Sequence, residues 1–400
     1  VTVTGGTFFV QCDSSFAGSV LDISGASNTF IGNGGATTID FDGTSPLSVT
    51  LTESSDLDGV VTVLNGVVVT FNTAIMAARN WTIGGGFSGH AIFLDDAAFG
   101  ADFTLNSGAI ATFEADLDLT VVGAFSNAGL VEFDGTVAQE LLTGISNMGD
   151  VDIMNTSANV FVNDEWISAN DGVVTVFSGA QLHFMDDATL TSTSTWNVHG
   201  EVYFVGTLGT PQFTISNPTF TGNGVLGFDT VGNIPVTINS ATDFNTCAVH
   251  VFGTGGSVTF NDGGSASLTC QDLDIDTTGD VDFLLPVTVS GALTGPAFNT
   301  LEFQNLVIDS SLDFSSSTGS TLDIASVVFG GTTIDITGVT NATIGGIEFT
   351  GTGARIVSYN AFPSHTIGGN ITIPDGCDVT FNGELRLSNS TVDVGGGTSG

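Results

Sequence analysis

A row of carboxylates lies between residues 270 and 282, where the chain reads CQDLDIDTTGDVD. Asp272, Asp274 and Asp276 occupy alternate positions with apolar residues between them. Successive side chains of a β-strand point to opposite faces, so this spacing places the three carboxylates and Cys270 on one face. Such a row could bind a cation, take part in acid–base catalysis, or form the solvated side of a sheet.

Calcium suits such a row, because it takes about six to eight oxygen ligands from carboxylates, carbonyls and water. No acidic cluster of the chain has the spacing of an EF-hand loop, and the alternative for each is a solvated face. We therefore expect either no cofactor or calcium, with Asp272, Asp274, Asp276 and Asp280 as the first candidate ligands. The acidic clusters are Asp272, Asp274, Asp276, Asp280 and Asp282; Glu53, Asp56 and Asp58; and Glu114, Asp116 and Asp118.

The acidic residues have almost no cationic partners. The chain has 42 acidic residues and no lysine, and its three cations are Arg79, Arg355 and Arg386, which gives a formal net charge of −39. Binding of nucleic acid depends on Lys and Arg at the phosphates, so nucleic acid is excluded as a partner. Attraction to an anionic membrane surface is excluded for the same reason.

The acidic and basic residues of the chain give little support for a catalytic site. Glycoside hydrolysis needs two carboxyl groups at a defined separation, but adjacent acids such as Asp95 and Asp96 are common in the chain and arise by chance. Lyases that act on polyuronates resemble one another in using Lys or Arg as base and anion-binding groups. Three dispersed arginines do not form such a cluster, so we expect no catalytic site and no enzymatic activity.

A short unit recurs along the chain and predicts its fold. It consists of a turn centred on Gly followed by alternating small and apolar residues that end in Phe, as in NGVVVTF (65–71), NAGLVEF (127–133) and TGDVDF (278–283). Several of these units lie 20 to 24 residues apart. A recurring period in this range indicates repeats that stack on their neighbours, with the Phe residues as ladders in the core.

This texture resembles that of right-handed parallel β-helix surface proteins, including autotransporter passengers, filamentous adhesins and phage tailspikes, and it extends over nearly the whole chain. The resemblance implies an all-β parallel β-solenoid with coils of about 20–24 residues, forming one elongated domain over residues 1–400. Tandem β-sandwiches are the alternative, although no super-period of about 100 residues is visible. Two segments with helical character, 71–81 and 137–148, are expected to be short helical insertions.

The four cysteines are Cys12, Cys247, Cys270 and Cys377, and they lack the spacing of a zinc site. Disulfides in an oxidising compartment are therefore the better interpretation. Equivalent positions one coil apart lie about 4.8 Å from each other, which favours a Cys247–Cys270 pair. The pairing of Cys12 and Cys377 is left open.

Several features favour an extracellular or cell-surface location. The sequence begins without Met, as expected after removal of a signal peptide, and no apolar run is long enough to cross a bilayer. Five N-x-S/T sequons are candidate glycosylation sites in a secreted chain, although several would arise by chance. These sequons begin at Asn80, Asn155, Asn341, Asn370 and Asn389.

The sequence thus favours a structural protein that assembles with copies of itself outside the cell, as in a sheath, a surface layer or a filament. Coil ends present unpaired strand edges, and neither end of the sequence shows a polar cap. An adhesin or phage-type spike that binds glycans or host receptors is the first alternative. A polysaccharide-degrading β-helix enzyme is the second.

Overall fold

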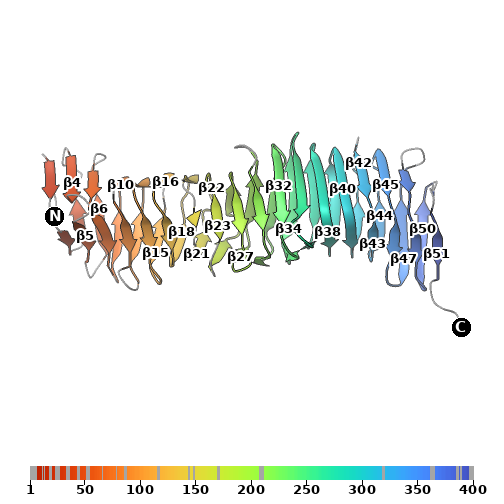
Figure 1. The fold of residues 1–400 in the computed structure, drawn as a ribbon, viewed down its shortest axis with the longest axis horizontal. Coiled ribbons are helices and arrows are strands. Elements are labelled where there is room, and N and C mark those ends of the chain that lie inside the picture. Colours follow the sequence, from red (N-terminus) through yellow and green to blue (C-terminus); the bar gives the residue numbers. More distant parts are fainter. Residues whose placement is uncertain are drawn as a thin grey trace. The chain divides into compact units, whose positions relative to one another are not determined.

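The chain folds as an all-β parallel β-solenoid of about 15 turns, without a helix in the described residues (Figure 1). The computed structural model describes residues 7–10, 12, 14–17, 20–22, 28–32, 37–42, 46–50, 55–64, 66–77, 79–84, 88–114, 118–142, 145–146, 149–168, 172–206, 211–317, 320–360, 365–383, 387 and 390–395. The predicted fold class is confirmed, and the alternative of tandem β-sandwiches is wrong because the strands pair in parallel.

Contacts within the chain define two compact units, Val1–Val202 and Tyr203–Gly400, called here the first and the second unit. The single domain predicted over residues 1–400 stays a prediction, and each unit is described by itself. The division falls within strand β28 (Glu201–Val205).

The first unit has about three short strands in each coil, one for each side. Sheet A contains β3 (Val20–Asp22), β6 (Leu47–Thr50), β9 (Val68–Phe71), β12 (His90–Phe93), β15 (Ile110–Phe113), β18 (Leu130–Phe133), β21 (Asp150–Ile153), β24 (Val173–Val176) and β27 (Thr195–Val198). Sheet B contains β1 (Thr7–Val10), β4 (Asn28–Gly32), β7 (Ser55–Asp58), β10 (Ile75–Ala77), β13 (Ala97–Phe99), β16 (Asp118–Val121), β19 (Gln139–Leu141), β22 (Asn159–Val162) and β25 (Gln181–Phe184). The third side is formed by β2 (Ser14–Phe16), β5 (Thr38–Phe41), β8 (Val60–Val63), β11 (Trp81–Ile83), β14 (Phe103–Leu105) and β17 (Phe125–Asn127) in sheet C, and by β20 (Ile145–Ser146), β23 (Trp166–Ser168) and β26 (Ala188–Leu190) in sheet D.

The second unit has one sheet B strand and one long or two short sheet D strands in most coils. Its sheet B strands are β31 (Val225–Asp229), β34 (Ala248–Gly253), β37 (Leu273–Thr277), β39 (Ala292–Ala297), β41 (Ser311–Asp313), β44 (Thr333–Asp335), β47 (Gly353–Ser358) and β50 (Cys377–Asn382). Its sheet D strands are β29 (Phe213–Ile215), β32 (Asn233–Ile238), β33 (Thr242–Asp243), β35 (Ser257–Asp262), β36 (Leu268–Cys270), β38 (Asp280–Val289), β40 (Thr300–Ile308), β42 (Thr321–Ile324), β43 (Val327–Phe329), β45 (Asn341–Ile344), β46 (Ile347–Phe349), β48 (His365–Ile367), β49 (Ile371–Ile373) and β51 (Val392–Val394). Strand β30 (Thr219–Thr221) also lies in this unit.

The register confirms the predicted coil length. Thr112 on β15 lies beside Glu132 on β18, 20 residues later in the chain. Ser358 on β47 lies beside Asn382 on β50, 24 residues later. Side chains at equivalent positions of successive coils therefore form rows that run across each sheet.

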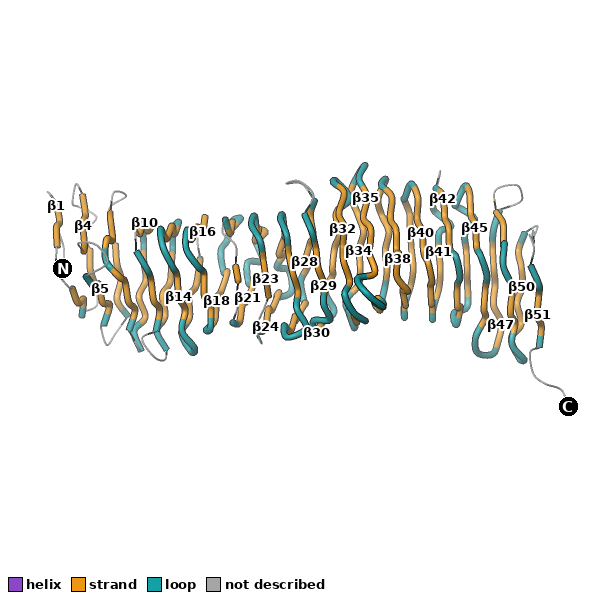
Figure 2. Tube along the Cα trace, viewed as in Figure 1, coloured by secondary structure: helices purple, strands orange, loops and turns teal. Residues whose placement is uncertain are grey.

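The Gly of the repeated unit is required by the turn that precedes the strand. Gly66 and Gly108 have φ angles of 73° and 77°, in the left-handed region that L residues with a Cβ seldom adopt. No heavy atom lies within 4 Å of a Cβ built at Gly66, so the backbone angle and not crowding selects glycine there. The chain turns at these positions and then starts β9 and β15. Figure 2 shows the turns and loops between strands in teal.

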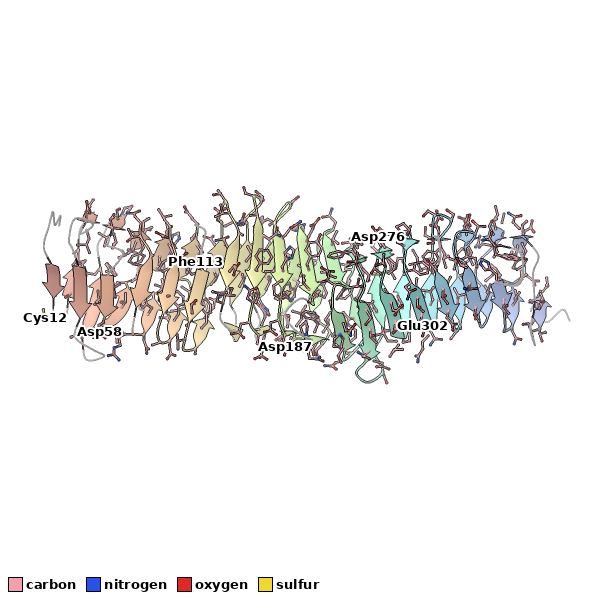
Figure 3. The ribbon with its side chains drawn as sticks, turned by 90° about the horizontal axis from the view of Figure 1, so that it is seen from above. Cys12, Asp58, Phe113, Asp187, Asp276 and Glu302 are labelled. Carbon is pink, nitrogen blue, oxygen red and sulfur yellow. The ribbon has the colours of Figure 1, made fainter. Side chains whose placement is uncertain are left out.

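The core of both units contains stacked phenylalanine rings, as the repeat predicts. All members of the stacks are buried, and Figure 3 labels Phe113 among them. Successive ring centroids are 5.0 to 5.6 Å apart in the first unit and 4.6 to 4.8 Å apart in the second. Such offset or parallel contacts add to the free energy gained by burial of the rings. The stacks consist of Phe71, Phe93, Phe113 and Phe133, and of Phe260, Phe283 and Phe303.

The predicted helical insertions are wrong for the described residues. The segment 71–81 contains strand β10, whose residues pair with β13 in the next coil. The segment 137–148 contains β19 and β20, which pair with β22 and β23. Backbone hydrogen bonds to neighbouring coils outweigh the high intrinsic helix propensity of the Ala, Met, Gln and Leu residues in these segments.

Candidate functional site

The acidic row that begins at Asp272 lies on the outward side of sheet B in the second unit. On β37, Asp274 is half-buried and Asp276 is exposed, while Leu273 and Ile275 are buried in the core. Figure 3 labels Asp276 at the surface of this unit. The alternation predicted for this strand is confirmed.

Two of these carboxylates accept a hydrogen bond from the next coil. Asp272 Oδ1 accepts from the backbone nitrogen of Ala292 at 2.7 Å, and Asp274 Oδ1 accepts from Thr294 Oγ1 at 2.6 Å. Asp274 Oδ2 also lies 3.7 Å from His250 Nε2. Asp272 and Asp274 therefore connect successive coils, which is a structural use of this part of the row.

Asp280 belongs to a different side of the solenoid. It lies on β38 of sheet D, whereas Asp274 and Asp276 lie on β37 of sheet B, so the predicted calcium ligands do not all converge. Asp280 Oδ1 accepts a hydrogen bond from Asn299 Nδ2 at 2.7 Å. Within the described part of the chain, no group of three or more His, Cys, Asp or Glu side chains could hold a metal ion. Calcium binding stays a prediction.

The two other acidic clusters are only partly described. Asp58 forms an ion pair with Arg79, with 2.7 Å between Oδ1 and Nε. Glu114 is exposed. Asp56 and Asp118 lie on β7 and β16. Glu53 and Asp116 lie outside the described residues.

The predicted position of Cys270 on the solvent face is wrong. Cys270 ends strand β36, and its side chain is fully buried together with that of Leu268. The chain turns a corner at residues 271–272 before β37 begins, so the alternation of faces does not continue from Cys270 to Asp272. Burial raises the pKa of the Cys270 thiol to about 12 and that of the Cys247 thiol to about 11.

All four cysteines are free thiols in the structure, which therefore does not contain the predicted Cys247–Cys270 disulfide. The backbone nitrogen of Gln271 donates to the carbonyl of Cys247 at 3.4 Å, so Gln271 follows Cys247 in the ladder of the next coil. Cys12 is exposed and Cys377 is half-buried.

One of the predicted glycosylation sites is wrong. Asn155 is buried, its Nδ2 donates to the carbonyl of Val137 at 2.6 Å, and its Oδ1 accepts from the backbone of Ser157 and Ala158. A glycan on this nitrogen would break the hydrogen bond and would have no room. Three of the sequons remain accessible and one lies outside the described residues; these are Asn80, Asn341 and Asn370, which are exposed, and Asn389.

A second acidic row, not predicted from the sequence, crosses sheet D of the second unit. Asp282 on β38, Glu302 on β40 and Asp323 on β42 are neighbours in register on three successive strands. Figure 3 labels Glu302 at the surface. Burial, followed by the charge of Asp280, raises the pKa of Asp282. The pKa of Glu302 is raised by burial and then by the neighbouring carboxylates, first Asp282 and then Asp323.

A corresponding row crosses sheet A of the first unit. Thr112 on β15, Glu132 on β18 and Asp152 on β21 are in register, and Thr175 on β24 follows them. Thr112 Oγ1 donates to Glu132 Oε2 at 2.6 Å and lies 2.8 Å from His90 Nε2. The sequence signal for both rows was the acidic residue directly before the last apolar residue of a repeat, as in VEF, VDI, VDF, LEF and LDI.

Two hollows of the second unit do not resemble ligand sites. One, of about 20 Å³, is lined by residues that include Ile336, Tyr359 and His365, and has room for about one water molecule. An open depression lies over Pro235 and Thr259. Neither has the size and enclosure of a small-molecule site.

No family model, curated protein or solved structure matches the chain. No helix in the described residues is long and apolar enough to cross a membrane.

Proposed function

We propose that the chain is a structural subunit of an extracellular assembly, in which β-solenoid coils of neighbouring copies pack side by side. The proposal rests on the outward rows of short polar side chains that repeat in register from coil to coil, such as Thr259, Asp282, Glu302 and Asp323. Rows of hydroxyl and carboxyl groups at the strand spacing of about 4.8 Å offer regularly spaced hydrogen-bonding partners to the same row of another copy.

The charge of the chain sets the conditions for such packing. With a net charge of −39, copies repel each other wherever their charges are unscreened. Salt at about 0.15 M reduces the screening length to about 8 Å, and bound divalent cations or protons neutralise carboxylates directly. We therefore expect assembly to increase with added calcium or with acidification.

Negative-stain electron microscopy and light scattering of the purified chain test this proposal. A chelator at low ionic strength should keep the chain monomeric, and millimolar calcium or mildly acidic buffer should produce ordered filaments or sheets. The triple variant D282N/E302Q/D323N should assemble at a lower calcium concentration than the unmodified chain. Glu348→Gln, which removes one exposed charge elsewhere in sheet D, is the matched control.

Two results would contradict the proposal. One is a monomeric chain under all of these conditions, including at high protein concentration. The other is the release of reducing ends or unsaturated products from a polysaccharide panel, which would favour the enzymatic alternative.

A further inference from the structure

Three half-buried aromatic rings gather on the outward side of sheet B in the second unit. Tyr203 lies on β28, and His250 and Phe252 lie on β34. The ring centroids of Tyr203 and Phe252 are 5.3 Å apart, with an interplanar angle of 77°, and those of His250 and Phe252 are 5.1 Å apart at 36°. Most described aromatic side chains of this unit lie in the core, and these three differ because they point outward. We call Tyr203, His250 and Phe252 the aromatic patch.

Gly227 lets two of these rings lie down on the sheet. It lies on β31 in register with His250, and a Cβ at this position would overlap the ring of Tyr203 and lie 3.0 Å from Cε1 of Phe252. The two rings occupy the space that a side chain would fill, and Gly227 is buried beneath them. Covering of an exposed glycine by a neighbouring aromatic ring is a known stabilising device in sheets. That role accounts for the rings of Tyr203 and Phe252 but not for the outward ring of His250 beside them.

Carboxylates border the patch on the next coil. Asp274 is in register with His250, and Asp276 is in register with Phe252. Asp274 Oδ1 accepts a hydrogen bond from the hydroxyl of Thr294, while Asp276 is exposed and its carboxylate faces solvent. Aromatic rings thus lie one strand spacing, about 4.8 Å, from strong hydrogen-bond acceptors.

The chemistry of the patch selects its ligand. Aromatic rings contact the apolar C–H faces of pyranose rings, and carboxylates accept hydrogen bonds from sugar hydroxyls. An anionic glycan is disfavoured, because the chain has a net charge of −39 and the described cation of this unit, Arg355, is buried away from solvent. We propose that the aromatic patch binds a neutral oligosaccharide.

Calorimetric titration of the full chain with neutral hexasaccharides tests this proposal. Cellohexaose, maltohexaose, xylohexaose and hexa-N-acetylchitohexaose serve as probes, and we expect at least one of them to bind. Phe252→Ala and Tyr203→Ala should each weaken that binding at least tenfold. Tyr203→Phe keeps the ring and should retain affinity within about threefold, a factor near the lower bound of stacking contributions.

The matched control is Phe161→Ala, which removes a half-buried outward aromatic residue of the first unit, 5.1 Å from His183. It should leave the affinity unchanged. The proposal is overturned if no probe binds, if Phe161→Ala weakens binding as much as Phe252→Ala, or if hexagalacturonate or a fully deacetylated chitohexaose binds more tightly than every neutral probe. Hydrogen exchange at β31 and β34 shows whether the variants are folded, and Phe252→Leu replaces Phe252→Ala if the latter is not.

Discussion

The acidic rows of the two units share one construction but compensate their charge differently. In both, a carboxyl side chain points outward directly before a buried apolar residue, as Glu132 precedes Phe133 and Asp282 precedes Phe283. In the first unit, two carboxylates lie between Thr112 and Thr175, and Thr112 also contacts His90. In the second unit, three carboxylates follow one another, and Thr259 donates to the first of them.

The difference shows what the inner and outer sides of a coil contribute. The inner Phe stack is common to both units and fixes where successive strands lie. The outer row can then vary, because a spacing of about 4.8 Å between strands allows either a hydrogen bond or a screened repulsion between neighbouring side chains.

The hydrogen bonds of Thr112 in the first unit fix the tautomer of His90. The Thr112 hydroxyl has one hydrogen, which it donates to the carboxylate of Glu132, a group that can only accept. His90 must therefore donate its Nε2 hydrogen to Thr112.

The largest effect should come from breaking the shared inner stack. We expect Phe113→Ala in the first unit and Phe283→Ala in the second to lower the free energy of unfolding by similar amounts, about 3–5 kcal/mol each, because each leaves a cavity in a packed core. Urea denaturation followed by circular dichroism measures the loss. The control is Leu284→Ala, which truncates the exposed neighbour of Phe283 and should cost less than about 1 kcal/mol. Equal costs for Phe283→Ala and Leu284→Ala would contradict the role assigned to the stack.

The next largest effect should separate the two outer rows. Thr112→Val removes the hydroxyl between His90 and Glu132 and leaves both without that partner, so we expect the first unit to lose about 1–3 kcal/mol. Fluorescence of Trp81, Trp166 and Trp196 reports this loss, because all three tryptophans are buried in the first unit.

The matched control for that change is Thr343→Val. Thr343 is exposed on β45, in register with Asp323 at the end of the acidic row of the second unit. Its replacement should change stability by less than about 0.5 kcal/mol. Hydrogen exchange measured by mass spectrometry follows this unit, which lacks tryptophan. If Thr112→Val costs no more than Thr343→Val, the hydroxyl does not compensate the row as described.

The stacks could be predicted from the sequence, and the rows could not. Alternation within each strand directs the closing Phe of the repeat to the core face. Burial of Phe113 and Phe283 therefore follows from local alternation alone. The neighbour of Asp282 depends on the number of residues in the corners of each coil. That number varies from coil to coil, so register is set by tertiary packing.

The same limit explains the errors at the candidate site. Alternation predicted Asp274 and Asp276 correctly, because one strand contains both. It failed for Cys270, and the grouping of Asp280 with these carboxylates failed as well, since a corner separates each of the two residues from that strand. The sequon at Asn155 was a pattern of three residues and contained no information about burial.

A change of pH should affect the two units in opposite directions. In the second unit, Asp282 and Glu302 have folded pKa values raised above the ordinary ones, so the folded state binds protons more tightly than the unfolded state. Their contribution to stability is complete below the ordinary carboxyl pKa and is lost as the pH rises through the raised values. Acidification from neutral pH should therefore stabilise this unit, by less than about 1 kcal/mol because Glu302 is exposed and Asp282 only half-buried.

The first unit contains a group with the opposite sign. Burial lowers the pKa of His183 from 6.5 to about 4, so its contribution is present above pH 6.5 and is lost as the pH falls toward 4. Asp152, whose pKa is raised mainly by burial, offsets part of this loss. Hydrogen exchange of both units between neutral and mildly acidic pH measures the two trends. His183→Asn should reduce the loss in the first unit, and a parallel response of both units in the unmodified chain would contradict the opposite signs assigned to His183 and to the pair Asp282 and Glu302.

The smallest effect should come from removing one charge of the three-carboxylate row. Glu302→Gln keeps the size of the side chain and removes repulsion from Asp282 and Asp323, so we expect the second unit to gain about 0.5 kcal/mol at neutral pH and low salt. Glu348→Gln is the control, because its neighbours in register, Val328 and Thr372, carry no charge and the change should be close to zero. Added salt should abolish the difference between the two variants, since screening weakens the repulsion that Glu302→Gln removes. A gain that persists in high salt would assign the effect to packing of the amide instead.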